Sequence, residues 1–359
     1  MFPTRRITLG GGDSFRDEYS LAFDGTDDYI GCGTGLTDIT SGGFTIGGWY
    51  QFATVSETHC LFARGDGSDE GYKLEYQYNG GSQRFLSTKT KTGGRNYNSY
   101  SIVLDINRWY HVLWVNGGTG SESALYLDNV KVVSNTHSED ILTASSEVFD
   151  MSRVVTANYL EGKISDVVFY NIALTASQVA TIYNGREPYN HKEGVASSNL
   201  AGWWRMGDGS IDKFNLVGDE VNATLGSDLI TDGGFDGDGS AWTVDNFSIG
   251  SGVATTSTNG ASIQQSLSIS TGDMIKIVAE IKNYTSGSIR YYTGAGTDVS
   301  RSFSSDGVHT HYLIANSTKV LFYSDNFNGS IDNVKVYKVN GNAGAMINMA
   351  SDDFTGDTP

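Results

Sequence analysis

Short segments in which hydrophobic and polar residues alternate dominate the chain. Residues 72–78 alternate strictly, and residues 275–282 place apolar side chains at every second position. A period of two buries one face of a β-strand and leaves the other in water. The denser apolar runs at 44–50 and 109–115 are typical of central strands. Between two apolar runs, Asp128-Asn129 favours a two-residue hairpin, because both residue types tolerate positive φ.

One helix is clearly indicated, after residue 174. Thr175 and Gln178 form a capping box, and Leu174 with Val179 forms a hydrophobic staple. Gly185 is expected to end the helix. A single short helix among many strand signals predicts an all-β protein.

The length of 359 residues suits two β-sandwich (jelly-roll) domains better than one. We therefore predict an N-terminal arm at 1–17, a first jelly roll at 18–206, a linker at 207–226, a second jelly roll at 227–340 and a C-terminal tail at 341–359. Both terminal segments combine a few apolar residues with a polar, low-complexity background, as do segments that become ordered on a partner. We expect both jelly rolls to fold without these arms, and at least one arm to contact other subunits or a capsid.

Charge and composition exclude several classes of function. The net charge of −17 repels phosphate backbones and anionic membranes, so nucleic-acid binding is not expected. No apolar stretch is long enough to cross a bilayer, so membrane insertion is not expected, and the first residues lack the apolar core of a secretory signal. Cys32 and Cys60 are expected to be free, buried thiols, with a single bridge as the alternative.

Six sequence landmarks in the first half resemble laminin-G-like, concanavalin A-like domains. They lie at residues 20–30, 44–49, 108–112, 125–129, 160–167 and 173–185. Each is weak alone, but they stand in family order across residues 18–206. The resemblance implies a lectin-like jelly roll, in which Asp24, Asp27 and Asp28 shape the first turn.

The second half resembles the jelly-roll carbohydrate-binding modules of the galactose-binding-like group. The resemblance rests on residues 229–236, Trp242, residues 262–265 and residues 327–334. That group often carries Glu where Asp236 stands here. Modules of the group often hold a structural Ca²⁺ between their first and last strands, which points to Asp236 and Asp332.

A second calcium candidate is the loop that carries Asp66, Asp69 and Glu70. Ca²⁺ prefers several oxygen ligands from such a flexible, carboxylate-rich loop. A solvated turn without any ion is the alternative, and the loop pattern by itself favours it.

Sugar binding requires exposed aromatic faces together with polar groups for the hydroxyls. The candidates all belong to the second domain: Tyr284, Tyr291, Tyr292 and Tyr323 as platforms, with Arg290, Asn283 and Gln264 as hydrogen-bonding partners. The alternative for each aromatic residue is a place in the core.

Catalysis is not expected. Glycosidases need two carboxylates across a sugar cleft, and the family signature Glu-x-Asp-x-x-Glu is absent. The nearest approach, Glu147-Val148-Phe149-Asp150, has the wrong spacing.

Residues 346–353 resemble the C-termini of structural proteins from marine tailed phages. The resemblance implies a virion protein, made in the host cytoplasm, that contacts other virion proteins. We expect a capsid decoration protein, head fibre or tail fibre that binds surface glycans, as a homo-oligomer with a trimer as the first choice. The alternatives are a purely structural virion component without a ligand, and a secreted polysaccharide-binding or glycanase-associated protein.

Overall fold

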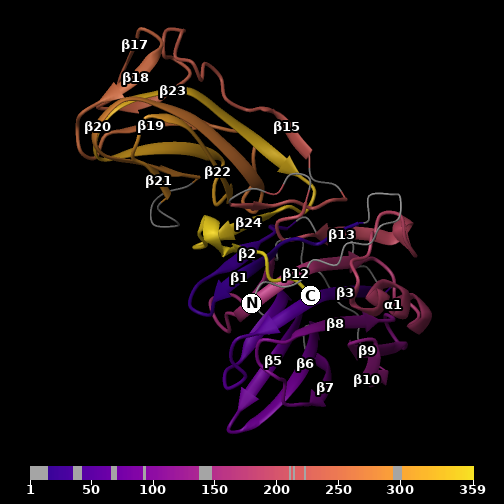
Figure 1. The fold of residues 1–359 in the computed structure, drawn as a ribbon. Coiled ribbons are helices and arrows are strands. Elements are labelled where there is room, and N and C mark those ends of the chain that lie inside the picture. The colour runs from indigo at the N-terminus through magenta and orange to yellow at the C-terminus, as the bar shows by residue number, and fades with distance from the viewer. Residues whose placement is uncertain are drawn as a thin grey trace, which may run out of the picture.

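The computed structural model describes residues 15–34, 43–65, 71–91, 94–136, 148–209, 212, 215–221, 224–293 and 301–359 (Figure 1). Within these ranges almost all regular structure is β, and every strand pair is antiparallel. The prediction of an all-β, jelly-roll fold is confirmed. No helix in the described ranges is long and apolar enough to span a membrane.

Two sheets build the first domain. The first sheet has the strand order β10-β9-β8-β3-β12-β1-β25, with β13 paired to β12. Its strands are β1 (Ser20–Asp24), β3 (Phe44–Phe52), β8 (Trp109–Asn116), β9 (Glu122–Leu127), β10 (Val130–Thr136), β12 (Glu161–Tyr170), β13 (Leu200–Trp204) and β25 (Phe354–Thr355).

The second sheet of this domain has the order β14-β24-β2-β11-β4-β5-β6-β7. Its strands are β2 (Tyr29–Gly31), β4 (His59–Arg64), β5 (Gly71–Asn79), β6 (Ser82–Lys91), β7 (Gly94–Ser101), β11 (Phe149–Met151), β14 (Leu216–Val217) and β24 (Gly344–Ile347). Side chains from both sheets meet in one core. The rings of Phe44 and Tyr72, for example, lie 5.4 Å apart across the sandwich.

The second domain is a single sheet that folds over itself. Its strands are β15 (Thr224–Asp228), β16 (Thr243–Asp245), β17 (Ser248–Gly250), β18 (Val253–Thr256), β19 (Ser262–Ser266), β20 (Met274–Tyr292), β21 (Arg301–Phe303), β22 (Gly307–Ile314) and β23 (Lys319–Asn340). The long strands β20 and β23 pair along most of their length and pass through both layers (Figure 1). A separate apolar core lies between the layers.

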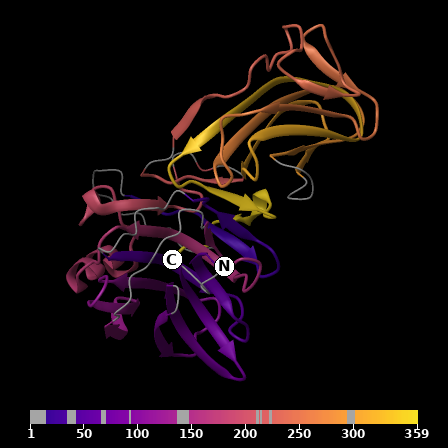
Figure 2. The ribbon, with the colours of Figure 1, turned by 180° about the vertical axis from the view of Figure 1, so that it is seen from behind.

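The C-terminal segment differs from the predicted tail. Strand β24 lies between β14 and β2, and β25 pairs with β1, so both belong to sheets of the first domain. Figure 2 shows this yellow segment returning from the second domain to the first. The apolar side chains of Met346, Ile347 and Met349 are buried there. The prediction of a free tail is therefore wrong for this segment. Its few apolar residues are buried within the protein and do not stay exposed for binding to another chain.

The predicted linker and N-terminal arm also contain docked segments. Leu216 and Val217 of the linker form β14 in the first domain. At the end of the arm, Phe15 packs on Trp203 and Asp17 forms an ion pair with Arg205. Residues 1–14 lie outside the described residues. The second domain is thus inserted between β14 and β24 of the first, and two chain crossings tether it.

Local sequence signals for the helix and the hairpin are confirmed. Helix α1 (Ala176–Tyr183) begins at the capping box of Thr175 and Gln178, and it buries Val179 and Ile182. Asn184 adopts the left-handed conformation after the last turn. Asp128 and Asn129 connect β9 and β10 with φ of 46° and 66°. The free, buried thiols predicted for the two cysteines are confirmed.

Candidate functional site

The outer face of β19, β23 and β20 gathers five side chains of mixed aromatic and polar character. Tyr323 lies opposite Ser262 on one side and Arg290 on the other, while Leu321 lies between Gln264 and Tyr292. Directly paired residues of neighbouring strands project to the same face of a sheet. We call the surface formed by Gln264, Arg290, Tyr292, Leu321 and Tyr323 the platform.

The opposite face of the same strands is buried, which leaves the platform side chains at the surface. Ile263, Phe322 and Tyr291 pair across the three strands and are buried in the core of the second domain. This face anchors the sheet, so the alternate positions are left to project outward. The platform side chains are partly exposed.

Polar contacts hold the platform side chains in place. The Arg290 guanidinium pairs with Asp325 at 3.2 Å, and its central carbon lies 5.4 Å from the centre of the Tyr323 ring. Lys319 donates a hydrogen bond of 2.8 Å to the side-chain oxygen of Gln264. Flat rings beside fixed donors and acceptors are the groups that contact the apolar face and the hydroxyls of a sugar.

The seven residues predicted to bind carbohydrate are only partly brought together, and Asn283, exposed beside Tyr284 in β20, is not part of the platform. Gln264, Arg290, Tyr292 and Tyr323 share the platform. Tyr291 is only 2% exposed and stacks on Phe303 in the core. Tyr284 lies at the bend of β20, where its ring packs near Phe327 and its hydroxyl donates to the carbonyl of Gly287. Core packing therefore accounts for Tyr291, and Tyr284 stands apart from the platform.

The two domains contact each other through a small apolar cluster. Leu216, Met274, Tyr312, Val339, Ala343, Ala345 and Ile347 are its buried members. Gly31 of β2 makes room for the second domain, because a Cβ at this position would lie 2.7 Å from the Cδ1 of Ile314. At this point of the interface, the Ile314 side chain of the second domain packs directly against the backbone of Gly31 in the first domain.

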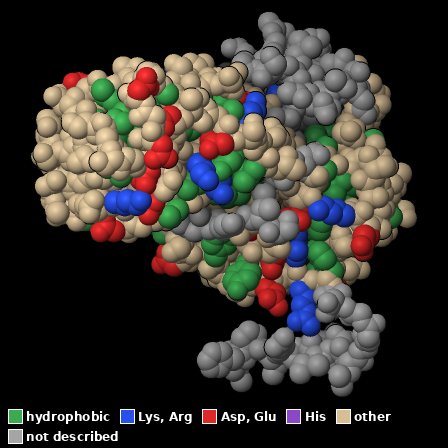
Figure 3. Space-filling model, turned by 90° about the horizontal axis from the view of Figure 1, so that it is seen from above, with side chains coloured by type: hydrophobic (Ala, Val, Ile, Leu, Met, Phe, Trp, Pro, Cys, Tyr) green, Lys and Arg blue, Asp and Glu red, His purple; other side chains and the backbone are tan. Residues whose placement is uncertain are grey.

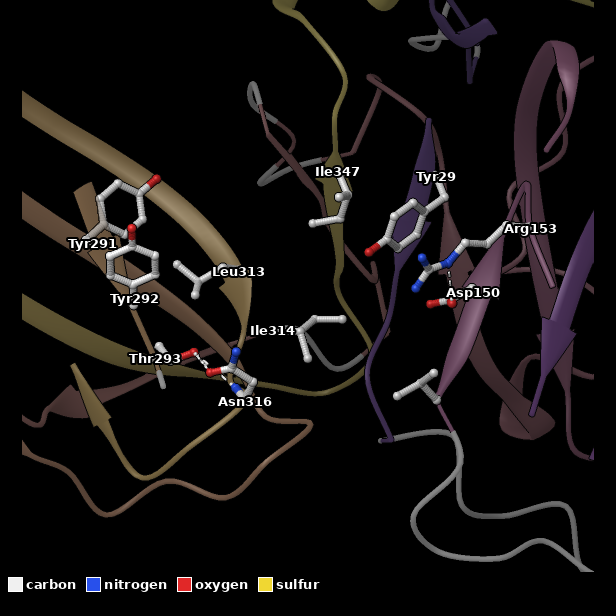
Figure 4. Close-up of a pocket in the computed structure, with 11 residues that line it drawn as sticks. Tyr29, Asp150, Arg153, Tyr291, Tyr292, Thr293, Leu313, Ile314, Asn316 and Ile347 are labelled. Carbon is white, nitrogen blue, oxygen red and sulfur yellow. Dashed lines mark hydrogen bonds and ion pairs between the residues drawn. The ribbon is translucent and has the colours of Figure 1, made fainter. Parts of the chain in front are cut away.

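A pocket of about 310 Å³ lies between the domains beside this cluster. Tyr291, Tyr292, Thr293, Leu313, Ile314 and Asn316 line it from the second domain, and Tyr29, Val148, Asp150, Arg153 and Ile347 line it from the first. Figure 4 shows the two sets facing each other, with Ile314 and Ile347 between them. Tyr292 belongs to both surfaces, so the platform continues into the pocket. The volume is at the lower end of the range for small-molecule sites.

Arg153 is the cation of this pocket, and two neighbours fix its orientation. Its Nε donates a hydrogen bond of 2.8 Å to Asp150, and the centre of its guanidinium lies 3.2 Å from the centre of the Tyr29 ring. In Figure 4 the guanidinium is directed toward the space between the domains, with Asp150 beside it. The Arg153 side chain is 18% exposed, whereas Asp150 is almost completely buried.

Asp150 is placed as the buried counter-ion of Arg153. Burial raises the pKa of this carboxyl above its usual value, and Arg153 opposes that shift. Its Oδ1 has no hydrogen-bond partner among the described residues. A buried polar atom without a hydrogen bond lowers the stability of the fold by about 1–3 kcal/mol. The ion pair with Arg153 offsets this loss for the Asp150 carboxylate.

Of the predicted calcium ligands, the structure describes Asp236 and Asp332. Asp332 is buried, and its carboxylate pairs with Lys282 at 2.6 Å and accepts from the backbone N–H of Asn333. Asp236 is exposed. Asp66, Asp69 and Glu70 lie outside the described residues. Calcium binding at either place stays a prediction.

Asp24, Asp27 and Asp28 bring carboxylate oxygens within 4.8 Å of one another. Asp24 accepts from the backbone N–H of Thr26, and Asp28 accepts from that of Asp24. These contacts agree with the expected role of shaping the first turn. Burial raises the pKa of Asp28 to about 6.

No local pattern in the sequence indicated the pocket residues of the first domain. Tyr29, Asp150 and Arg153 come from different parts of the chain, more than 130 residues from Tyr292 and Asn316. Patterns over a few residues cannot show that these side chains lie close together, because their proximity depends on how the second domain packs on the first. For Leu321, alternation with the buried Val320 and Phe322 was an available signal.

Comparisons with known proteins support the fold of the first domain. Residues 24–180 match the family model of the concanavalin A-like lectin/glucanases superfamily. The resemblance predicted for this part of the chain is confirmed, and its fold is lectin-like. No curated protein matches the sequence.

Several solved structures share part of the backbone arrangement. A pentraxin from Limulus polyphemus is 15% identical with a TM-score of 0.38, over 50% of this chain and 85% of that chain. A protein described as carbohydrate-binding from Bacteroides ovatus is 16% identical with a TM-score of 0.44, over 57% of this chain and 56% of that one. The Ruminococcus gnavus IT-sialidase CBM40 bound to sialyllactose is 10% identical with a TM-score of 0.38, over 46% of this chain and 97% of that chain. At these values the likeness carries no argument about function.

Proposed function

We propose that this protein is a non-catalytic glycan-binding protein and that the platform is its principal contact surface. The observation that carries the proposal is the alignment of Tyr323, Arg290 and Gln264 on neighbouring strands, outside a fully packed core. A sugar ring laid on Tyr323 would contact an aromatic face and reach fixed hydrogen-bonding groups on both sides.

The chemistry of the pocket favours binding over hydrolysis. Cleavage of a glycosidic bond requires one carboxyl group as acid and a second as base or nucleophile. Among the described residues that line the pocket, Asp150 is the single carboxylate, and it is buried behind Arg153. Such a carboxylate positions a cation and is not presented to a scissile bond.

Replacing Tyr323 with alanine is expected to weaken binding of a recognised polysaccharide at least tenfold, about 1.4 kcal/mol. Glycan-array binding followed by calorimetry on the best ligand is the measurement, with product analysis for released oligosaccharides. Tyr97→Ala is the matched control, because Tyr97 is 58% exposed on β7 of the first domain. Equal affinities of Tyr323→Ala and the intact protein would contradict the platform, and released oligosaccharides would contradict the absence of catalysis.

The proposed setting of this binding is a phage virion, where many copies would convert weak single-site affinity into avidity. The support for this setting is the resemblance of residues 346–353 to phage structural proteins. We expect the chain to be found by mass spectrometry in purified particles, together with capsid and tail proteins. Its absence from such particles would contradict the virion setting, whereas the proposal of glycan binding would still stand.

A further inference from the structure

The interdomain pocket is lined by one cation, Arg153, and by its counter-ion, Asp150. The Arg153 side chain is 18% exposed, whereas the Asp150 side chain beside it is 5% exposed, so the guanidinium is the more accessible of the two. The hydrogen bond to Asp150 uses Nε, and the ring of Tyr29 supports the guanidinium face. The Tyr159 side chain also contacts the guanidinium, and the remaining N–H groups of its outer nitrogens are the part that a ligand can reach.

An arginine held in this way is suited to a planar anionic group. Parallel N–H donors of a guanidinium match the two oxygens of a carboxylate and can bind them together. Fixing the side chain in advance reduces the conformational entropy lost on binding. Asp150 and Tyr29 supply that fixation, so both act as positioning residues.

The remaining walls suit the rest of a sugar ring. Tyr292 offers an aromatic edge or face, and Asn316 offers a side-chain amide, whose oxygen accepts a hydrogen bond of 3.1 Å from the buried hydroxyl of Thr293. Leu313 and Ile314 close the pocket with apolar groups. The combination of one cation, neutral polar groups and an aromatic ring fits a single carboxylated sugar better than a neutral one.

The net charge of −17 acts against a long polyanion but not against a single acidic residue. At physiological ionic strength, charges more than about 8 Å away are largely screened. On the face shown in Figure 3, basic and acidic side chains are interspersed, with no single basic stripe that could follow a charged polymer. The charged groups of the pocket itself, Arg153 and its less exposed partner Asp150, therefore set the field that a bound ligand meets.

We infer that the interdomain pocket binds a carboxylated sugar residue of the glycan and that the Arg153 guanidinium binds its carboxylate group. This inference rests on the proposed glycan-binding function and names the chemical class of one residue in that glycan. Because both domains line the pocket, the bound sugar would also connect them.

The test compares two probes that differ in one group: methyl glucuronide, which carries a carboxylate, and methyl glucoside, which carries a hydroxymethyl group. Binding is measured by calorimetry and by ligand-observed NMR on the full chain. We expect the glucuronide to bind at least tenfold more tightly, and Arg153→Gln to abolish this preference. Equal affinity for both probes, or a preference that survives Arg153→Gln, would overturn the inference.

A matched control exists in the first domain. Arg108 also lies over a tyrosine ring, at 4.4 Å from Tyr110, and pairs with an aspartate, Asp128, at 2.6 Å. Arg108→Gln removes the same kind of group away from the pocket and is expected to leave the preference unchanged. Loss of the preference in this control would show that the effect is not local and would also overturn the inference.

A second variant avoids dependence on the folding of Arg153→Gln. Val148 lines the pocket and is partly exposed, so Val148→Trp fills the space without removing a polar group. It is expected to abolish glucuronide binding while Tyr323-dependent polysaccharide binding persists. Retained glucuronide binding in Val148→Trp would place the acidic-sugar site elsewhere. If polysaccharide binding by the intact protein does not depend on Tyr323, the proposed function is contradicted instead.

Discussion

Deleting residues 341–359 is expected to prevent cooperative folding of the first domain. The deletion removes β24 from between β14 and β2, and it removes β25 from the edge of the other sheet. Burial of a Met or Ile side chain contributes about 1.5–3 kcal/mol, and Met346, Ile347 and Met349 are all buried. Their sum is comparable to the whole stability of a typical domain, about 5–15 kcal/mol.

Hydrogen bonds near both ends of this segment add to the effect. The Asp357 carboxylate accepts from Lys163 at 2.5 Å, from Gln51 at 3.1 Å and from Trp109 at 3.2 Å. The Nε1 of Trp204 donates to the carbonyl of Asn342 at 2.7 Å. The deletion would therefore leave buried donors without acceptors, which is itself destabilising.

Thermal unfolding followed by circular dichroism and limited proteolysis measures the result. Removal of residues 358–359 alone is the control, because it keeps Asp357, and its unfolding curve should match that of the intact chain. If the chain lacking 341–359 unfolds at the same temperature as the intact protein, the C-terminal strands are dispensable and the segment behaves as a tail.

Replacing Gly47 with alanine is expected to cost more than about 4 kcal/mol or to prevent folding, a size that indicates steric conflict in a core. Gly47 lies in the middle of β3, with φ of 156°, where it pairs with Leu113 of β8. A Cβ there would overlap the carbonyl oxygen of Val112. Strands β3 and β8 would have to separate, and they are central in the sheet.

Gly250→Ala provides the comparison for this substitution. Nothing lies within 4 Å of a Cβ at Gly250, and such a replacement commonly stabilises by about 0.4–1 kcal/mol through the unfolded state. Urea unfolding of both variants gives the free energies of unfolding. A Gly47→Ala protein as stable as the Gly250→Ala protein would show that β3 can move away from β8 at little cost.

Alternation and local turn chemistry were sufficient for much of the secondary structure. The strictly alternating segment at 72–78 lies within β5, and the dense runs near 44–50 and 109–115 are β3 and β8. The capping box at Thr175 placed the start of α1. These signals act over a few residues and depend on the side-chain period or on one backbone turn, so they are readable without knowledge of the tertiary contacts.

The same local reasoning assigned the C-terminal segment wrongly. Residues 344–347 are small or apolar and only four in number, too few for a periodic pattern, and their partners β2 and β14 lie far away in the chain. Strand pairing at such separation leaves no mark on the local sequence.

The sequence by itself determined the all-β class and the lectin-like first half, because each follows from alternation or from local motifs. Tertiary structure alone decided that β24 completes the first domain and that Arg153 faces Tyr292 across the pocket. The physical reason is the same in both cases. Two surfaces remote in sequence meet because the second domain is inserted between two neighbouring strands, and the packing of Ile314 and Ile347 at that junction sets which side chains face each other.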